Sequence, residues 1–545
     1  MESKNVSISP HGVAYPLPAD GDYEFEYERI AELAEEAKKS GKEIVVVMGV
    51  GFVGAVMAAI VADSVDPNGK SGKFVIGVQR PSTRSFWKIP LLNQGISPVK
   101  AEDPEVAPMI ERCVKQKKTF IATYTMDALR LADVVVVDVQ CDYLKNELGN
   151  VCNGDVEMSA LEEAFEVIAT RIRPETMVLI ETTVPPGTTE QIAFPIMKKL
   201  FLKRGIETDP LLAHSYERVM PGKEYVASIR DFWRVCSGVN EAAKQKVVKF
   251  LSEILNVAKF PLTVLDRPIE SETAKIVENS YRATILAFLH EWSIFSEKNG
   301  VDMVKVINAI KVRPTHSNMI FPGPGIGGYC LPKDGGLGMW AYKRILGFED
   351  DIFRITPEAI NINDTRSLHA AQMVRDALRN MNIPIANAEV LVLGASYRED
   401  VGDTRYSGSE VLVRKLAEMG AEPSVHDPYV ENWWEFTEQE KFPIKGSKSV
   451  FFRNQKKLKD LTVQNDLNKA LAGIDALILA VRHKDYMDLD PKEVIKTIGK
   501  PVAVIDCFGI LSDVNIKEYL ELGCEVKGLG RGHIRRIKEE IRKTK

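Results

Sequence analysis

Residues 321–334 hold the side chains of this sequence that are best suited to covalent chemistry, in the order Phe-Pro-Gly-Pro-Gly-Ile-Gly-Gly-Tyr-Cys-Leu-Pro-Lys-Asp. These glycines and prolines exclude a helix or a central strand, so we expect a shaped loop whose backbone can approach a ligand closely. Cys330 follows the glycines, with Lys333 and Asp334 just after it. A thiol beside a cation is a candidate nucleophile, because the positive charge favours the reactive thiolate. The alternative is a glycine turn around a buried structural cysteine.

A second pair of candidates is Lys275 and Asn279, which stand four residues apart. Residues 271–299 contain no glycine or proline and predict one long helix. The two side chains would then share a helix face and could act on one small group, although an exposed polar face is the plain alternative. Apolar residues later in this helix indicate burial between domains or subunits.

Polar residues also follow predicted strands. Thr183 comes after the strand expected at residues 177–181, and Glu217 follows a short apolar segment. In a doubly wound sheet, ligands bind at the carboxyl ends of the strands, so Thr183 is a site candidate. Glu217 could be a base, or it could form a surface ion pair with Arg218.

The start of the first sheet carries a glycine motif. A buried strand at residues 44–48 precedes Gly49, Gly51 and Gly54, and an apolar helix runs to about residue 62. Strand, GxGxxG and helix in this order predict a dinucleotide site in which the helix N-terminus holds the pyrophosphate.

The next strand, expected at residues 74–78, ends without the acidic residue that binds the adenosine ribose in NAD sites. Gln79 takes that position and Arg80 follows it, with Ser82, Thr83 and Arg84 after it. The glutamine could bind a ribose hydroxyl, whereas the arginines and hydroxyls could accept a 2′-phosphate. NAD is the expected cofactor, and NADP is a second possibility. The alternative for the two arginines is that they are solvated loop residues that bind no phosphate.

Composition excludes several classes of protein. The chain has 545 residues, 45% of them hydrophobic, and a formal net charge of -5. No Lys/Arg run predicts nucleic-acid binding, and no apolar run approaches the ~18 residues of a membrane span. The basic last fifteen residues fit a solvated helical tail. Seven cysteines without paired spacing indicate reduced thiols in the cytoplasm and no zinc site or disulfide frame. The polar start of the chain is not a signal peptide.

The alternation of strands and helices predicts an α/β fold. Further strands are expected at residues 133–139, and a second α/β unit starts at residue 389, with strands at 476–481 and 502–506. The expected architecture is two Rossmann-like doubly wound parallel sheets joined by a central helical domain with the long helix. Asp427 and the segment 403–405 lie at the ends of early segments of the second unit, where the nucleotide part of a substrate could bind.

Six motifs occur in order: the glycines at 49, 51 and 54, then residues 181–187, 216–222, 275–279, 325–334 and 402–405. Together they resemble those of the nucleotide-sugar 6-dehydrogenase family, which includes UDP-glucose and GDP-mannose dehydrogenases and their N-acetylhexosamine relatives. The resemblance extends from about residue 44 to residue 532.

The resemblance implies an irreversible four-electron oxidation of a sugar C6 alcohol to a carboxylate, with two nicotinamide cofactors reduced. It implies a cofactor domain at 41–260, a central domain at 261–383 that makes a homodimer or a larger assembly, and a nucleotide-sugar domain at 384–545. Residues 1–40 lie outside the resemblance and are expected to form an N-terminal extension that packs on the surface of the first domain. A capsule, glycan or surface-polymer pathway is also what the family implies.

The resemblance assigns a role to each candidate. Cys330 would capture an aldehyde as a thiohemiacetal that is oxidised to a thioester. Lys275 and Asn279 would stabilise the oxyanion, Asp334 and Thr183 would position water, and Glu217 would be the base for hydrolysis. Lys333 would hold substrate or favour the thiolate. The expected cofactor-binding residues are Gly49, Gly51, Phe52, Val53, Gly54, Gln79, Arg80, Thr183 and Lys333. The expected substrate-binding residues are Glu217, Arg218, Val219, Lys275, Asn279, Arg282, Arg313, Gly327 and Arg405, of which Arg313 would come from a partner subunit.

The substrate suggested by the segments 217–222 and 322–325 is UDP-N-acetylmannosamine or UDP-N-acetylglucosamine, with UDP-glucose or GDP-mannose as the alternative. Gln140, Cys141 and His290 replace residues that are usual in the whole family. Lys333 follows the UDP-glucose and GDP-mannose pattern, whereas many N-acetylhexosamine enzymes have an apolar residue there. Two other hypotheses compete: a two-electron dehydrogenase of the hydroxyacid type, which needs neither Cys330 nor a third domain, and a non-catalytic nucleotide-sugar-binding protein.

Overall fold

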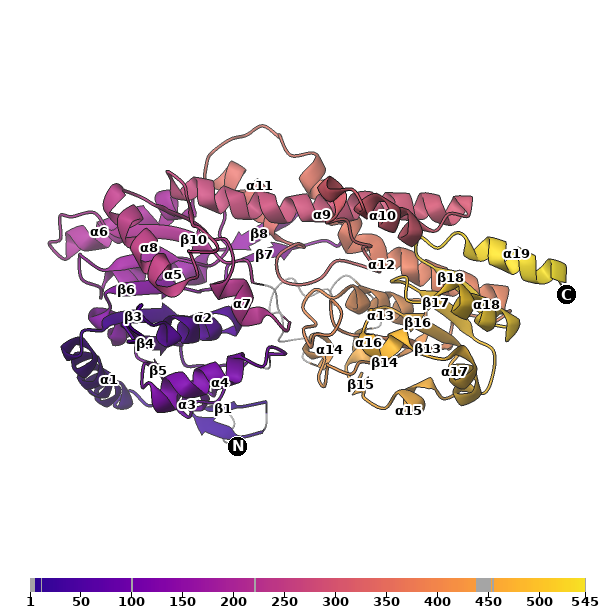
Figure 1. The fold of residues 1–545 in the computed structure, drawn as a ribbon, viewed down its shortest axis with the longest axis horizontal. Helices are drawn as coiled ribbons and strands as arrows, with labels where there is room; N and C mark the ends of the chain where they lie inside the picture. Colours follow the sequence, from indigo (N-terminus) through magenta and orange to yellow (C-terminus); the bar gives the residue numbers. More distant parts are fainter. Residues whose placement is uncertain are drawn as a thin grey trace. The chain divides into compact units, whose positions relative to one another are not determined.

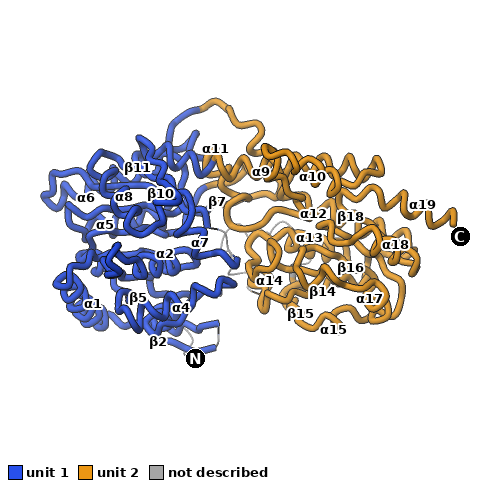
Figure 2. The backbone as a smooth tube through the Cα atoms, in the orientation of Figure 1, with its two compact units in different colours: residues 1–142, 156–276, 340–348 blue, residues 143–155, 277–339, 349–545 orange. Residues whose placement is uncertain are grey.

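The computed structural model describes residues 5–10, 12–99, 101–219, 222–437, 452 and 455–544. Met220 and Pro221 of the 216–222 motif lie outside these described residues. The chain forms two compact units, each built from separate stretches (Figure 2). The first contains residues 1–142, 156–276 and 340–348, and the second contains residues 143–155, 277–339 and 349–545. Within the described residues, helices of the length and apolarity that a membrane span requires do not occur.

The first unit is organised around an eight-stranded sheet in the order β12-β11-β10-β9-β6-β3-β4-β5 (Figure 1). Its strands are parallel except at the β10–β11 pair. Their bounds are β3 Glu43–Met48, β4 Lys73–Val78, β5 Phe120–Thr123, β6 Val134–Val137, β9 Met177–Ile180, β10 Leu211–Tyr216, β11 Val235–Gly238 and β12 Thr263–Val264. The direction of strand addition reverses at β3, so the carboxyl ends of β3 and β6 flank the switch point where ligands bind.

Apolar strands and helices bury this sheet on both sides. β3, β4 and β6 are almost entirely buried runs rich in valine and isoleucine, as expected for parallel strands covered on both faces. The helices of this unit are α1 Asp22–Lys39, α2 Phe52–Asp63, α3 Lys88–Asn93, α4 Val106–Glu111, α5 Ser159–Ala169, α6 Phe194–Lys203, α7 Tyr225–Arg230 and α8 Glu241–Ile254. A core cluster joins α2 to the strands and to α8.

The N-terminal extension packs on this first unit, as expected. A small antiparallel pair, β1 Val6–Ile8 and β2 Ala14–Pro16, precedes α1. The carboxylate of Glu26 in α1 accepts a hydrogen bond of 2.7 Å from Thr123 Oγ1 at the end of β5. Tyr23 of the same helix contacts Tyr124 edge to face. The extension therefore lies against the carboxyl end of the sheet edge.

The second unit contains a six-stranded parallel sheet in the order β15-β14-β13-β16-β17-β18. The bounds are β13 Glu389–Leu393, β14 Glu422–His426, β15 Val463–Gln464, β16 Ala476–Leu479, β17 Ala503–Asp506 and β18 Glu525–Gly528. The strand order repeats that of the first sheet, so β13 and β16 flank a second switch point. The predicted doubly wound α/β fold is thus confirmed for both sheets.

Helices bury the second sheet and form a separate helical layer. The bounds are α10 Met303–Lys311, α12 Ile355–Asn380, α13 Gly408–Glu418, α14 Trp434–Thr437, α15 Leu467–Leu471, α16 Lys484–Met487, α17 Pro491–Ile498, α18 Asp513–Glu521 and α19 Ile534–Thr544. The last half of α12 joins the core under the sheet. A two-stranded sheet is formed by β7 Asp142–Lys145 and β8 Gly154–Glu157.

Two helices, α9 Pro268–Asn299 and α11 Asp334–Arg344, run from one unit into the other. The long predicted helix therefore exists and starts three residues earlier than the expected residue 271, because a proline is tolerated in a first helical turn. β14 was not predicted from the sequence, since its residues Glu-Pro-Ser-Val-His offer no apolar run.

Candidate active site

The glycine loop after β3 has the shape that a dinucleotide requires. A Cβ added to Gly54 would lie 1.9 Å from the Gly49 carbonyl oxygen, and one added to Gly49 would lie 2.7 Å from the Asp138 carbonyl oxygen. A Cβ on Gly51 would meet no protein atom within 4 Å. Gly49 and Gly54 thus close the turn, while Gly51 leaves open space where a pyrophosphate can approach the start of α2. These residues fit NAD, with Phe52 and Val53 forming the first turn of α2.

Asp138, which the sequence did not single out, lies directly after β6 beside this loop. Its Oδ2 atom is buried without a hydrogen-bond partner among the described residues. Burial raises the pKa of Asp138 well above its usual value, and the carboxyls of Glu181 and Glu217 act in the same direction. A Cβ added to Gly54 would lie 3.0 Å from Asp138 Oδ2, so this carboxyl faces the glycine loop, and its position at a strand end was the signal that could have identified it.

The loop after β9 contains Thr183 and is held by Glu272, a residue of α9 that sequence reasoning missed. The Glu272 carboxyl accepts hydrogen bonds from the backbone N–H groups of Gly187 (2.6 Å) and Thr189 (2.8 Å). The hydroxyl of Thr189 donates a third bond of 2.6 Å. Burial raises the pKa of Glu272 to about 7, although these hydrogen bonds oppose the shift. Glu272 thus fixes the shape of the segment that carries Thr183.

Glu217, Arg218 and Lys275 come together at the end of β10. Lys275 Nζ donates 2.8 Å to the backbone carbonyl of Glu217, and it lies 5.4 Å from the centre of the Tyr216 ring. The Glu217 carboxylate accepts from the N–H of Val219, while Arg218 donates to the Trp233 carbonyl at 2.6 Å. The expected base and the expected oxyanion-stabilising lysine are therefore neighbours.

Asn279 has a different partner from Lys275. Its Nδ2 atom donates 2.7 Å to Asp334 Oδ2, and Lys333 Nζ donates 2.8 Å to the other oxygen of that carboxylate. Lys333 and Asp334 are completely buried. Lys275 and Asn279 thus contact different protein groups, and the expectation that they act together on one small group stays a prediction. The two oxygens of the Asp334 carboxylate each accept a hydrogen bond, one from Asn279 and the other from Lys333.

Cys330 lies in the turn that precedes α11, four residues before Asp334, and is partly exposed. Its backbone carbonyl accepts from the N–H groups of Lys333 (3.1 Å) and Asp334 (3.0 Å), so the first turn after it is tightly wound. Tyr329 lies between two cations, since Lys333 Nζ is 4.4 Å and the Arg405 guanidinium 5.5 Å from its ring centre. Lys333 and Arg405 are each paired with a carboxylate, so Cys330 follows a tyrosine that lies near two compensated cations.

The glycines of the loop pack against the segment that follows β13. A Cβ on Gly327 would lie 2.4 Å from Tyr397 Cβ, and one on Gly325 would lie 2.8 Å from the Cα of Gly408. Gly328 N donates 2.9 Å to the Arg405 carbonyl. These glycines therefore allow the close approach of the neighbouring loop, which joins the cysteine loop to the second sheet. The expected contact of Gly327 with a substrate stays a prediction.

Arg405 itself is held by Asp403, whose oxygens accept at 2.7 Å from Nη2 and 3.0 Å from Nε. Burial lowers the pKa of Arg405, but the hydrogen bonds and charge of Asp403 outweigh burial and the net shift is upward. Cys330 acts on this guanidinium in the same upward direction, which places the two groups within electrostatic reach. Arg282 and Arg313, by contrast, are exposed.

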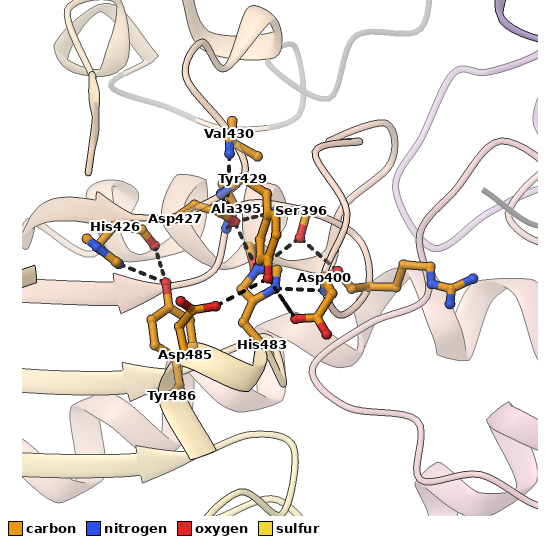
Figure 3. Close-up of polar contacts among 12 residues, drawn as sticks. Ala395, Ser396, Asp400, His426, Asp427, Tyr429, Val430, His483, Asp485 and Tyr486 are labelled. Carbon is orange, nitrogen blue, oxygen red and sulfur yellow. Dashed lines mark hydrogen bonds and ion pairs between the residues drawn. The ribbon is translucent and has the colours of Figure 1, made fainter. Parts of the chain in front are cut away.

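A buried polar network fixes the loops at the second switch point (Figure 3). Asp427, directly after β14, accepts from the N–H groups of Ala395 (2.7 Å) and Tyr429 (2.8 Å) and from His483 Nε2 (3.2 Å). His483 Nδ1 accepts from the Asp400 N–H at 2.9 Å, so its proton resides on Nε2. Burial alone would raise the pKa of Asp427, but the hydrogen bond and charge of His483 together with the backbone N–H donors outweigh burial, and the pKa is lowered. Asp427 therefore shapes the loop and is not free to bind a ligand.

Among the described residues, three side chains of the types that bind metal ions lie close together. Asp302, Asp513 and His533 bring ligand atoms within 4.8 Å of one another. Lys305 Nζ contacts Asp513, and Arg531 Nε lies 3.6 Å from Asp302. Protein cations thus already balance the two carboxylates.

The dinucleotide loop at one switch point, together with a cysteine loop packed on a second doubly wound sheet, defines an NAD-binding oxidoreductase. Three models of the UDP-glucose/GDP-mannose dehydrogenase family match the chain: the NAD binding domain at residues 43–256, the central domain at 269–365 and the UDP binding domain at 391–513. The chain belongs to this family and is a NAD-dependent nucleotide-sugar dehydrogenase. The domain boundaries expected at residues 40, 260 and 383 stay a prediction.

Relatives span nearly the whole chain. It is 25% identical over 492 residues to the UDP-N-acetyl-D-mannosamine dehydrogenase of Pyrococcus horikoshii, covering 90% of this chain and 100% of that protein. A protein of the same name from Methanocaldococcus jannaschii is 26% identical over 389 residues, covering 70% of this chain and 76% of that protein. A solved structure, the NDP-N-acetyl-D-galactosaminuronic acid dehydrogenase from Methanosarcina mazei Go1, is 26% identical with a TM-score of 0.72, covering 93% and 98% of the two chains.

Proposed function

We propose that this protein oxidises the C6 alcohol of a UDP-N-acetylhexosamine to a carboxylate in two steps, through a thioester on Cys330. The observation that carries the proposal is the position of Cys330 before α11, followed by an Asp334 carboxylate that Lys333 and Asn279 hold from both sides. A rigid carboxylate next to a nucleophilic thiol suits acyl chemistry, which requires an ordered water or proton acceptor.

The proposed reaction balances in atoms and electrons. Each of the two oxidations would remove a hydride from C6, for which NAD held at the glycine loop would supply the acceptor. After the first, the Cys330 thiolate adds to the aldehyde carbon and forms a thiohemiacetal. After the second, the C6 carbon is a thioester, and water cleaves its C–S bond to give the carboxylate and the free thiol. One alcohol, one water and two NAD thus give one carboxylate, two NADH and three protons.

The remaining roles are those expected from the sequence. Asn279 would donate to the oxyanion when it is not bound to Asp334, and Arg405 would contact the substrate. Lys275, Thr183 and Glu217 keep their expected parts in oxyanion stabilisation, water positioning and hydrolysis. The substrate class is supported by the names of the relatives, which act on UDP-N-acetyl-D-mannosamine. UDP-N-acetylglucosamine, UDP-glucose and GDP-mannose are the alternatives that a substrate panel tests.

We also infer a homodimer formed through α9. Five large apolar side chains on this helix, Val277, Tyr281, Phe288, Trp292 and Phe295, are between 45% and 58% exposed. Their spacing of three, four or seven residues puts them on one face. A continuous aromatic patch of this kind marks a protein interface. We also propose a reducing, cytoplasmic setting, which the seven cysteines without paired spacing support.

The test is the number of NAD molecules reduced per sugar, measured by absorbance with UDP-N-acetylmannosamine, UDP-N-acetylglucosamine, UDP-glucose and GDP-mannose. We expect two NADH per sugar for the preferred substrate. Cys330→Ser should lower kcat at least about a thousandfold, because it removes the group that carries the covalent intermediate. Cys152→Ser, at an exposed cysteine of the same unit, should retain activity. One NADH per sugar with an active Cys330→Ser variant would establish a two-electron dehydrogenase.

A further inference from the structure

The loop that follows β4, residues 79–85, carries cations and hydroxyls where the adenosine ribose of a dinucleotide lies. We propose that this loop binds the 2′-phosphate of NADP, so that the chain binds NADP at least as tightly as NAD. The inference rests on the dinucleotide fold of the first unit and does not depend on which sugar is oxidised.

The position of the loop follows from the sheet. β4 is the parallel neighbour of β3, and Gly49 N of the glycine loop donates 2.9 Å to the Val78 carbonyl at the end of β4. Gln79 is the next residue, and its N–H donates 3.1 Å to the Thr123 carbonyl of β5. Gln79 is thus fixed at the strand end where NAD sites place a carboxylate for the ribose diol. An amide there does not repel a 2′-phosphate.

The charges around this position favour an anion. Residues 79–101 contain no aspartate or glutamate and four cations, Arg80, Arg84, Lys88 and Lys100, the last of which lies outside the described residues. Two carboxylates from other elements lie nearby, and both are paired. Glu26 binds Arg29 at 2.9 Å and Thr123 at 2.7 Å, while Glu163 of α5 binds Arg80.

The ion pair between Arg80 and Glu163 is weak enough that a phosphate could replace Glu163 as the partner of Arg80. Arg80 Nη1 lies 3.1 Å from Glu163 Oε2, and the two side chains are 72% and 57% exposed. Exposed ion pairs of this kind contribute about 1 kcal/mol or less. A phosphate dianion offers the same guanidinium two charge-assisted hydrogen bonds, which are stronger. Arg80 is therefore the residue we expect to turn from Glu163 to the 2′-phosphate.

The loop is ordered before any ligand binds. Ser85 Oγ donates 3.2 Å to the Arg80 carbonyl and lies 2.7 Å from Ser82 Oγ. Trp87 Nε1 donates 2.8 Å to the Arg84 carbonyl. The N-terminal extension adds support, because the buried hydroxyl of Ser7 accepts from the Trp87 N–H at 3.2 Å. Such preorganisation reduces the entropy lost on binding.

The experiment is isothermal titration calorimetry of the full-length protein with NAD and with NADP, without sugar. We expect NADP to bind as tightly as NAD or more tightly. Arg80→Ala should weaken NADP at least about tenfold and change NAD by less than about threefold, since one charged hydrogen-bonding partner is lost. Gln79→Asp should weaken NADP in the same way and leave NAD unchanged or improved. Glu163→Gln, which releases Arg80, should tighten NADP alone.

The matched control is Arg130→Ala, which removes an exposed arginine paired with Asp127 (3.0 Å) just before β6, at the opposite end of the strands. It should change neither affinity. NADP binding more than tenfold weaker than NAD in the unmodified protein would overturn the proposal. So would an Arg80→Ala variant that loses both cofactors equally while its thermal unfolding is unchanged. Since no sugar is present, this outcome is independent of whether Cys330 forms a thioester.

Discussion

At the scale of the residue, single buried carboxyls decide the shape of the loops around the site. Glu272 takes three hydrogen bonds from the segment 187–189, and Asp427 takes bonds from residues on both sides of a strand end. Neither side chain needs to touch a ligand. Both instead remove the freedom of the backbone on which the ligand-facing residues stand, which is how a loop becomes a precise support.

Glu272 should make stability depend on pH. Its pKa in the folded protein is about 7 against an ordinary 4.5, so the folded chain holds the proton to higher pH than the unfolded chain. The stabilisation is complete below pH 4.5 and is lost as the pH rises to about 7, by roughly 3 kcal/mol. Glu272→Gln removes this dependence. Differential scanning calorimetry should show the Tm of the variant rising relative to the unmodified protein between pH 5 and pH 7.5. A difference that stays constant over that range would contradict the assignment.

Residue types at strand ends could be predicted from the sequence, but their partners could not. Cys330, Lys333 and Asp334 stood out because they are close together in a distinctive loop. The contact of Asn279 with Asp334 joins residues 55 positions apart, and that of Glu272 with Gly187 joins residues 85 apart. Such contacts depend on how a helix end meets a loop from another element, which a single sequence does not encode in any local pattern.

At the scale of the element, the glycine loop after β3 contains glycines with two different roles. Gly54 permits close packing, because a Cβ there would meet the Gly49 carbonyl at 1.9 Å. Gly51 has open space around it. The strand, loop and helix of this element were predicted correctly, since the apolar run and the glycine spacing are local signals.

The two glycines should respond differently to alanine. Gly54→Ala should lower the Tm and abolish NAD binding, because the turn must open to admit the methyl group. Gly51→Ala should leave the Tm nearly unchanged and weaken NAD at least about tenfold, as the methyl group fills space that the pyrophosphate needs. Gly21→Ala, where a Cβ would also meet nothing within 4 Å, serves as the control and should alter neither property. Equal loss of Tm in all three variants would refute this division.

The loops at the second switch point form another element, and hydrogen bonds to Asp427 hold their backbone. Asp427→Ala leaves the N–H groups of Ala395, Ser396, Tyr429 and Val430 without their acceptor. Several unsatisfied buried donors should destabilise the unit by about 3 kcal/mol or more and weaken binding of UDP. Asp485→Ala, an exposed carboxyl that reaches Tyr429 at 3.3 Å, should have little effect. Thermal unfolding and UDP calorimetry of both variants check the prediction. Equal Tm values for the two variants would count against the role of Asp427 in holding these loops.

At the scale of the whole molecule, the proposed dimer depends on the aromatic face of α9. Phe288, Trp292 and Phe295 contact one another edge to face, with ring centres 6.2 Å and 5.2 Å apart. The sequence predicted that these residues would be buried between domains or subunits. In the single chain, all three remain about half exposed, which leaves a subunit contact as the way to cover them.

Trp292→Glu should convert the dimer to a monomer, because a carboxylate would be buried in an apolar contact. Light scattering coupled to size-exclusion chromatography measures the change directly. Val514→Glu, at a lone apolar residue of α18 that is 74% exposed, is the control and should leave the mass unchanged. A Trp292→Glu protein with the mass of the unmodified one would place any self-association elsewhere.

The discontinuous first unit has a consequence for synthesis on the ribosome. Its sheet is complete once Val264 has been made, yet the loop at Gly187 packs against Ile345 and Leu346, to which an added Cβ would come within 3.0 Å and 3.2 Å. Those residues belong to the stretch 340–348, which emerges only after Cys330. A nascent chain can therefore fold its cofactor sheet early, but the Thr183 loop gains its last neighbours only after Cys330 has been made.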